Sequence, residues 1–85
     1  MYAVEFLPSA ARALPKLDRT VQRRIGRRID RLASDPRAGA AKLRGVDDVW
    51  RARVGDYRIL YVIEDERLVV VVVRVAHRRE AYRQG

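Results

Sequence analysis

Apolar and charged residues alternate on both sides of a Gly-Asp pair in the second half of the chain. The first run spans Trp50–Val54 and the second Tyr57–Tyr61, with Gly55-Asp56 between them. Such a pattern predicts two strands joined by a two-residue hairpin turn, in which glycine supplies a positive φ. The predicted cross-strand pairs are Val54 with Tyr57, Arg53 with Arg58, Ala52 with Ile59, and Trp50 with Tyr61.

This hairpin should have one apolar face and one arginine face. The apolar face suits a core and consists of Trp50, Ala52, Val54, Tyr57, Ile59 and Tyr61. The other face carries Arg51, Arg53 and Arg58. Like charges opposite each other destabilise a sheet, so we interpret these guanidinium groups as a site for an anion.

The N-terminal part predicts a strand and a short helix. Residues 2–7 alternate loosely, as in a strand. Ser9 is expected to be the N-cap of a helix over residues 9–14, and Pro15 should stop or kink that helix.

A longer helix is predicted over residues 19–34, with Asp18 as its N-cap. Its apolar stripe consists of Val21, Ile25, Ile29 and Leu32. Arginines occupy many of the other positions of this helix, and the simplest interpretation is that they form a solvated face without a specific role. The alternative is a surface that contacts phosphates and adds sequence-independent affinity. A membrane-surface helix is disfavoured, because the apolar face is short and lacks Trp and Phe.

The remaining pattern completes a single domain over residues 1–85. Residues 37–42 read as a connector, residues 64–66 as an acidic turn, and Leu68–Val75 as a strand buried on both faces. The order β-α-α-β-β-β predicts an α+β fold, with two N-terminal helices packed on a small antiparallel-dominated sheet.

The amino-acid composition favours some classes of function and disfavours others. The chain has 19 basic and 11 acidic residues and a net charge of +8, which favours polyanions and first of all nucleic acid. With no cysteine and one histidine, neither a metal site nor another cofactor is expected. No signal pattern and no apolar run long enough for a bilayer is present, so we expect a soluble, cytoplasmic domain.

Arginine, histidine and tyrosine remain as the carriers of chemistry. If the last strand pairs beside the Arg58 strand, it could bring His77, Arg78 and Tyr82 to the arginine face. Such a set suits RNA cleavage without a metal ion, in which the substrate's 2′-hydroxyl attacks the adjacent phosphate. Guanidinium groups stabilise the added charge, and His77 could act as base or acid near neutral pH. A surface histidine without a role is the alternative.

Several segments in order resemble the RelE/ParE superfamily of bacterial toxin–antitoxin toxins, most closely its RelE-like branch. They are Leu43-Arg44-Gly45, the hairpin from Trp50 to Tyr61, the acidic turn with the valine-rich strand, and the closing residues 75–82. The resemblance implies a RelE-like microbial ribonuclease fold. It also implies a metal-independent endoribonuclease that cleaves mRNA in the ribosome and so inhibits translation.

The resemblance also implies residue roles. Arg58 matches an arginine at the scissile phosphate, Arg78 one that stabilises the transition state, and Tyr82 a tyrosine that stacks on a base. Arg51 and Arg53, expected with Arg44 to bind RNA phosphates, stand where family members carry lysines. Arginine does not release its proton, so the role of base passes to His77.

The implied partners are a RelB-like antitoxin, the ribosome and mRNA, with operator DNA contacted only through the antitoxin and no membrane. Two alternatives stay open. One is a ParE-like inhibitor of DNA gyrase, and the other is a non-toxic relative that only binds an antitoxin.

Overall fold

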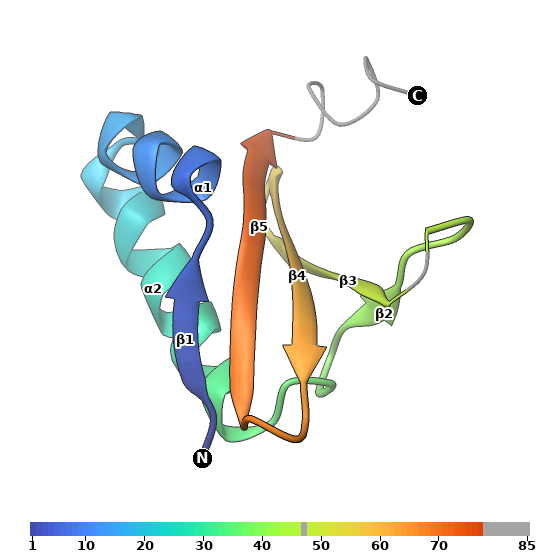
Figure 1. Cartoon of the computed structure of the whole chain (residues 1–85). Helices are drawn as coiled ribbons and strands as arrows, with labels where there is room; N and C mark the ends of the chain where they lie inside the picture. The colour runs from blue at the N-terminus through green and yellow to red at the C-terminus, as the bar shows by residue number, and fades with distance from the viewer. Residues whose placement is uncertain (47, 78–85) are drawn as a thin grey trace.

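The computed structural model describes residues 1–46 and 48–77, which form two helices packed on a five-stranded sheet (Figure 1). In chain order the elements are β1 (Ala3–Phe6), α1 (Pro8–Ala13), the 3-10 turn η1 (Leu14–Lys16), α2 (Arg19–Ser34), β2 (Ala41–Lys42), β3 (Val49–Val54), β4 (Tyr57–Glu64) and β5 (Val69–His77). The predicted α+β order is confirmed. The short strand β2 is added within the segment expected to be a connector.

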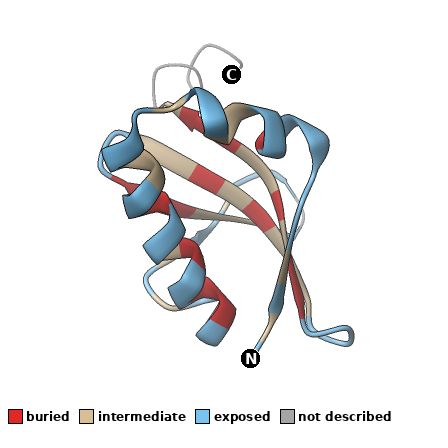
Figure 2. Ribbon diagram, turned by 90° about the vertical axis from the view of Figure 1, so that its left-hand side faces the viewer, coloured by how far each residue is buried: buried red, intermediate tan, exposed pale blue. Residues whose placement is uncertain are grey.

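The strands lie in the order β1-β5-β4-β3-β2. All neighbours are antiparallel except β1 and β5, which run parallel. Both helices lie on the same side of this sheet (Figure 2). Val70, Val72 and Val75 of β5 face the helices and are buried. On its other face Val69 and Ala76 are also buried, whereas Val71 and Arg74 are half-buried. The expectation that this strand is buried on both faces therefore holds near its ends only, because the helices cover one face and the middle of the other face is partly exposed.

Helix α2 forms as its apolar periodicity predicts. The Asp18 carboxylate accepts a hydrogen bond from the backbone N–H of Thr20 at 3.1 Å and so caps the helix. Ile25, Ile29 and Leu32 are buried against the sheet. Their core partners include the fully buried hairpin residues Ala52, Ile59 and Tyr61, together with Val70 and Val72 of β5.

Helix α1 begins one residue earlier than predicted. Pro8 occupies its first turn, where the missing N–H of proline costs no helical hydrogen bond, and Leu7 is the N-cap residue. The Ser9 hydroxyl instead donates to the carbonyl oxygen of Val73 at 3.1 Å. The prediction of Ser9 as N-cap was wrong, and its side chain ties α1 to β5.

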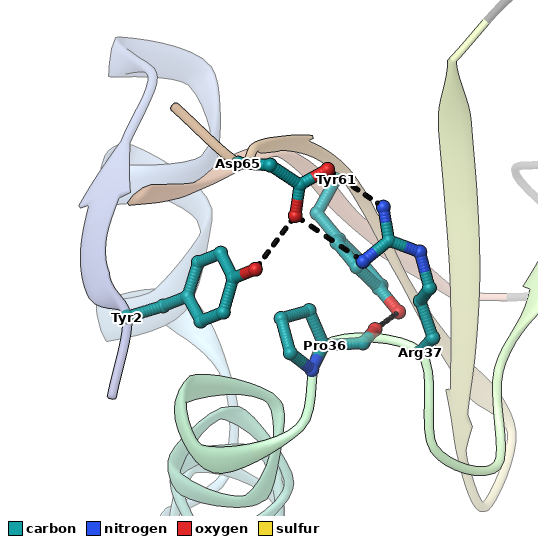
Figure 3. A network of polar contacts seen from close by, with 5 residues as sticks. All are labelled: Tyr2, Pro36, Arg37, Tyr61 and Asp65. Carbon is teal, nitrogen blue, oxygen red and sulfur yellow. Dashed lines mark hydrogen bonds and ion pairs between the residues drawn. The ribbon is translucent and has the colours of Figure 1, made fainter. Parts of the chain in front are cut away.

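A polar network fastens the end of the sheet away from the hairpin turn (Figure 3). The Asp65 carboxylate accepts hydrogen bonds from the Tyr2 hydroxyl at 2.6 Å and from Arg37 Nη2 at 2.8 Å. The hydrogen bond from Arg37 has the largest effect and lowers the pKa of Asp65, and the hydrogen bond from Tyr2 lowers it further. Beneath them the Tyr61 hydroxyl donates to the carbonyl oxygen of Pro36 at 2.6 Å. The loop after α2 is thereby held against the middle of β4.

Across residues 1–46 and 48–77, no helix is both long enough and apolar enough to cross a membrane.

Candidate functional site

The hairpin turn is the predicted two-residue turn at Gly55-Asp56. Gly55 has φ +57, a conformation that glycine adopts without strain. All four predicted pairs are present, with Val54 opposite Tyr57, Arg53 opposite Arg58, Ala52 opposite Ile59, and Trp50 opposite Tyr61.

This register places Arg51, Arg53 and Arg58 on the sheet face opposite the helices. Arg53 and Arg58 are direct cross-strand partners, and Arg51 pairs with Leu60 one position further along the same face. Directly opposed residues have Cβ atoms roughly 5 Å apart, within common reach of a single phosphate group. Arg53 is exposed, while Arg51 and Arg58 are half-buried. The three arginines therefore share one face.

A β-bulge adds a fourth arginine to this face. Tyr61 pairs with Val72, but Leu60 pairs with Arg74, so β5 carries one additional residue between these pairs. Val70 and Val72 face the helices, and strict alternation would point Arg74 toward the helices as well. The bulge reverses the alternation and places Arg74 beside Leu60. We name Arg51, Arg53, Arg58 and Arg74 the arginine face.

Sequence reasoning missed Arg74, although a signal was present. It is the single charged residue within the run of β-branched residues from Val69 to Val75. A guanidinium group is rarely buried without a partner, so a lone arginine in such a strand marks the strand's uncovered side.

The same bulge turns His77 away from the arginine face. His77 pairs with Tyr57 on the side of the helices, and the two rings meet edge to face with centroids 5.2 Å apart. The imidazole also lines hollows with Arg12 of α1 and Arg24 of α2. β5 does pair beside β4, as the convergence hypothesis required, but His77 and Arg58 point to opposite sides of the sheet.

The structure does not place the remaining predicted site residues on the arginine face. Arg44 is exposed in the loop after β2, at the end of β3 away from the hairpin turn. Arg78 and Tyr82 lie outside the described residues, so their predicted roles stay predictions.

Charge on this side of the sheet is divided between its two ends. The positions paired beside the arginine face are uncharged and include Ala41, Leu60 and Ala76. At the far end, Glu5 and Glu64 both contact Arg67, at 3.3 and 2.7 Å. Among the described residues of this face, the arginines therefore gather near the hairpin turn and the carboxylates lie at the opposite end.

Chemically, this arrangement suits a phosphate group with more than one charged oxygen. Guanidinium groups bind phosphate oxygens in pairs and remain charged at any working pH. Within the described part of the chain, no group of three or more His, Cys, Asp or Glu side chains is placed to hold a metal ion.

The fold and sequence match a known family. A family model described as the ParE toxin of the type II toxin–antitoxin system parDE matches residues 4–82, and the chain belongs to this toxin family. The broader RelE/ParE assignment made from the sequence is thereby confirmed.

Relatives within the superfamily carry RelE-type names. Toxin RelG of Mycobacterium tuberculosis is 38% identical over 85 residues, covering 98% of each chain. The mRNA interferase toxin RelE of Escherichia coli K12 is 30% identical and covers 94% of this chain and 86% of its own. Among solved structures, the intact E. coli RelBE toxin–antitoxin complex matches with a TM-score of 0.83 and 30% identity, over 91% of this chain and 96% of that one. The M. tuberculosis RelBE2 complex matches with a TM-score of 0.81 and 35% identity, over 89% and 96%.

Proposed function

We propose that this chain is the toxin of a toxin–antitoxin module and an endoribonuclease that cleaves mRNA on the ribosome. The observation that carries the proposal is the arginine face, in a chain whose relatives include proteins named mRNA interferase. Three of its four arginines were expected from the sequence, and the fourth joins them through the bulge.

In the proposed reaction the 2′-oxygen of one nucleotide attacks the adjacent phosphorus, and the bond from phosphorus to the 5′-oxygen breaks. The products are a 2′,3′-cyclic phosphate and a 5′-hydroxyl end. Negative charge on the non-bridging oxygens rises in the transition state, and Arg58 with its partner Arg53 stabilises it. Arg51 and Arg74 hold the neighbouring backbone. The nucleophile comes from the substrate, so the step needs no metal ion.

Proton transfer is assigned to His77, with Arg78 and Tyr82 completing the site from the C-terminal residues. In the described conformation the imidazole packs on Tyr57. Its neighbour Ala76 pairs with Arg58, so His77 lies one residue from the arginine face. To act at that face, the imidazole must leave Tyr57 and turn around the end of β5.

The test is cleavage of a defined mRNA by the purified chain, with and without programmed ribosomes, followed by mapping of the 5′ ends. We expect cuts in translated regions that leave 5′-hydroxyl ends. Arg58→Ala should lower the rate about 10²–10³-fold, the typical loss when one transition-state donor is removed. Arg23→Ala, on an exposed position of α2, is the matched control and should cleave like wild type.

Full activity of Arg58→Ala would refute the assigned site. Equal cleavage of free mRNA at the same positions would refute the requirement for the ribosome.

We further propose a RelB-like antitoxin as partner, since the solved relatives include toxin–antitoxin complexes. Expression of the chain alone should arrest growth, and co-expression of its antitoxin should restore it. If expression of the chain alone does not arrest growth, the alternative of a non-toxic relative is favoured.

The description of the matching family as ParE keeps gyrase inhibition as a second candidate. A supercoiling assay separates the two. Inhibition of gyrase without cleavage of translated mRNA would replace the ribonuclease proposal.

A further inference from the structure

A second basic surface lies around the free edge of β3, between the hairpin and α2. It is an open groove of ≈ 420 Å³, lined by Arg24, Arg27, Arg28, Arg31, Arg53, Val54 and Gly55. We call it the α2 groove. Five of its seven lining residues are arginines and none is acidic, which gives it the local charge balance of a polyanion site.

Arg53 belongs to both surfaces. It pairs with Arg58 on the arginine face and also lines the α2 groove. This is possible because β2 pairs only with Trp50 and Arg51, which leaves β3 without a strand neighbour beyond Arg51 on that side. The basic surface therefore continues around the edge of the sheet.

The groove is built by close packing against glycine. A Cβ atom at Gly55 would lie 3.3 Å from Arg24 Nη2, and one at Gly39 would lie 3.2 Å from Arg28 Nη2. Arg28 Nη2 also donates to the carbonyl oxygen of Ala38 at 2.8 Å, while its enclosed Nη1 has no acceptor among the described residues. These contacts hold guanidinium groups in place without neutralising them.

We infer that the α2 groove binds the phosphate backbone of the same RNA strand whose scissile phosphate lies on the arginine face, with Arg53 as the link between the two. The inference rests on the proposed function and extends it to the path of the substrate. Guanidinium groups along one helix, with no aromatic or amide side chain in the lining, favour phosphate contacts that carry no sequence preference. The groove therefore adds affinity and leaves the chemical step unchanged.

The test compares two double variants of equal net charge. Arg27→Gln/Arg31→Gln removes two groove arginines, and Arg19→Gln/Arg23→Gln removes two arginines of the same helix that do not line the groove. The probe is fluorescent 2′-O-methyl RNA of 4 or 12 nucleotides, which binds but cannot be cleaved because its 2′-oxygen is blocked. Binding is measured by anisotropy over a range of salt concentrations.

For the 12-mer, we expect the groove variant to bind about tenfold more weakly than wild type. The slope of log K against log salt should become shallower by about 1.4, since each contact to a single-stranded phosphate contributes about 0.7. The 4-mer can reach fewer of the groove arginines than the 12-mer, so the groove variant should lose less affinity for the 4-mer than for the 12-mer. The control variant should match wild type with the 12-mer.

Equal weakening by both double variants would reduce the effect to net charge and overturn the inference. So would a groove variant that loses the 4-mer as strongly as the 12-mer. If an oligoglutamate of equal charge competes as well as RNA for the groove, an acidic protein segment replaces RNA as its occupant. The proposed function is tested separately by the cleavage assay. If wild type cleaves mRNA but the groove variant binds the 12-mer as tightly as wild type does, only this inference is refuted. If binding depends on the groove and on RNA length but wild type does not cleave, only the proposed function is refuted.

Discussion

The Tyr61 hydroxyl offers a stability test whose magnitude follows from the structure. Tyr61 is fully buried, and its hydroxyl donates to the buried Pro36 carbonyl at 2.6 Å. Tyr61→Phe keeps the ring and removes the donor, leaving a buried carbonyl without this partner. Such a loss costs about 1–3 kcal/mol. A domain of this length has roughly 4–13 kcal/mol of total stability, so the change is measurable and substantial.

The assay is urea unfolding followed by circular dichroism, with a thermal melt as second readout. We expect a lower midpoint at an unchanged m-value, because the surface exposed on unfolding stays the same. The melting temperature should fall by roughly 4–8 °C for each kcal/mol lost.

The matched control is Tyr57→Phe. Tyr57 is half-buried, and its hydroxyl has no hydrogen bond to another described residue. Its loss should change stability by less than about 0.5 kcal/mol. Equal effects of the two substitutions, or a neutral Tyr61→Phe, would refute the view that this hydroxyl anchors the loop after α2.

The Tyr61 hydroxyl should also make the stability of the fold depend on pH in the alkaline range. Burial raises the pKa of Tyr61, so the folded state holds this proton more tightly than the unfolded state. The contribution is present below the unfolded tyrosine pKa of about 10 and is lost as pH rises through the folded pKa. The stability gap between wild type and Tyr61→Phe should therefore narrow above about pH 10.

Three further predictions concern the bulge, the polar network and the proton acceptor. Deleting Val73 should leave a protein that still unfolds cooperatively in a thermal melt, because it removes the additional residue of the bulge and keeps Arg74 opposite Leu60 and Val75 opposite Ile59; a deletion variant that no longer folds would contradict the described bulge. The pKa of Asp65 is lowered, so its contribution to stability is present above the unfolded pKa of about 3.9 and is lost as pH falls through the folded value. Asp65→Asn should therefore unfold at a lower denaturant concentration than wild type at pH 7, with the gap closing in acid; a gap constant with pH would contradict this. His77→Gln should lower the cleavage rate and flatten the dependence of that rate on pH, and an unchanged pH profile would exclude His77 as the base.

The hairpin could be predicted down to its residue pairs, whereas the last strand could not. A two-residue turn fixes every later pair, and alternating arginines show which face is outward. In β5 the five consecutive valines carry no alternation, so nothing in the sequence reveals where the bulge falls. This is why His77 was expected beside Arg58 and Arg74 was overlooked.

Helix α2 was predictable because its cap and stripe are both local signals. The start of α1 was not, because Pro8 and Ser9 both suit a helix start and the choice between them depends on a distant carbonyl of β5. The α2 groove was equally hidden. The sequence shows its arginines as one more solvated helix face, and only the fold brings Arg53 beside them.

The parallel pairing of β1 with β5 has a consequence for how the protein is made. Ala3 pairs with Val69, so β1 has no strand to pair with until β5, the last described strand, has been synthesised. The strand that waits is also the one that delivers Arg74 to the arginine face. Contacts so distant in sequence form late and slowly. A nascent chain therefore has no assembled arginine face, and under the proposed function we expect the mRNA from which it is translated to stay intact until β5 has left the exit tunnel.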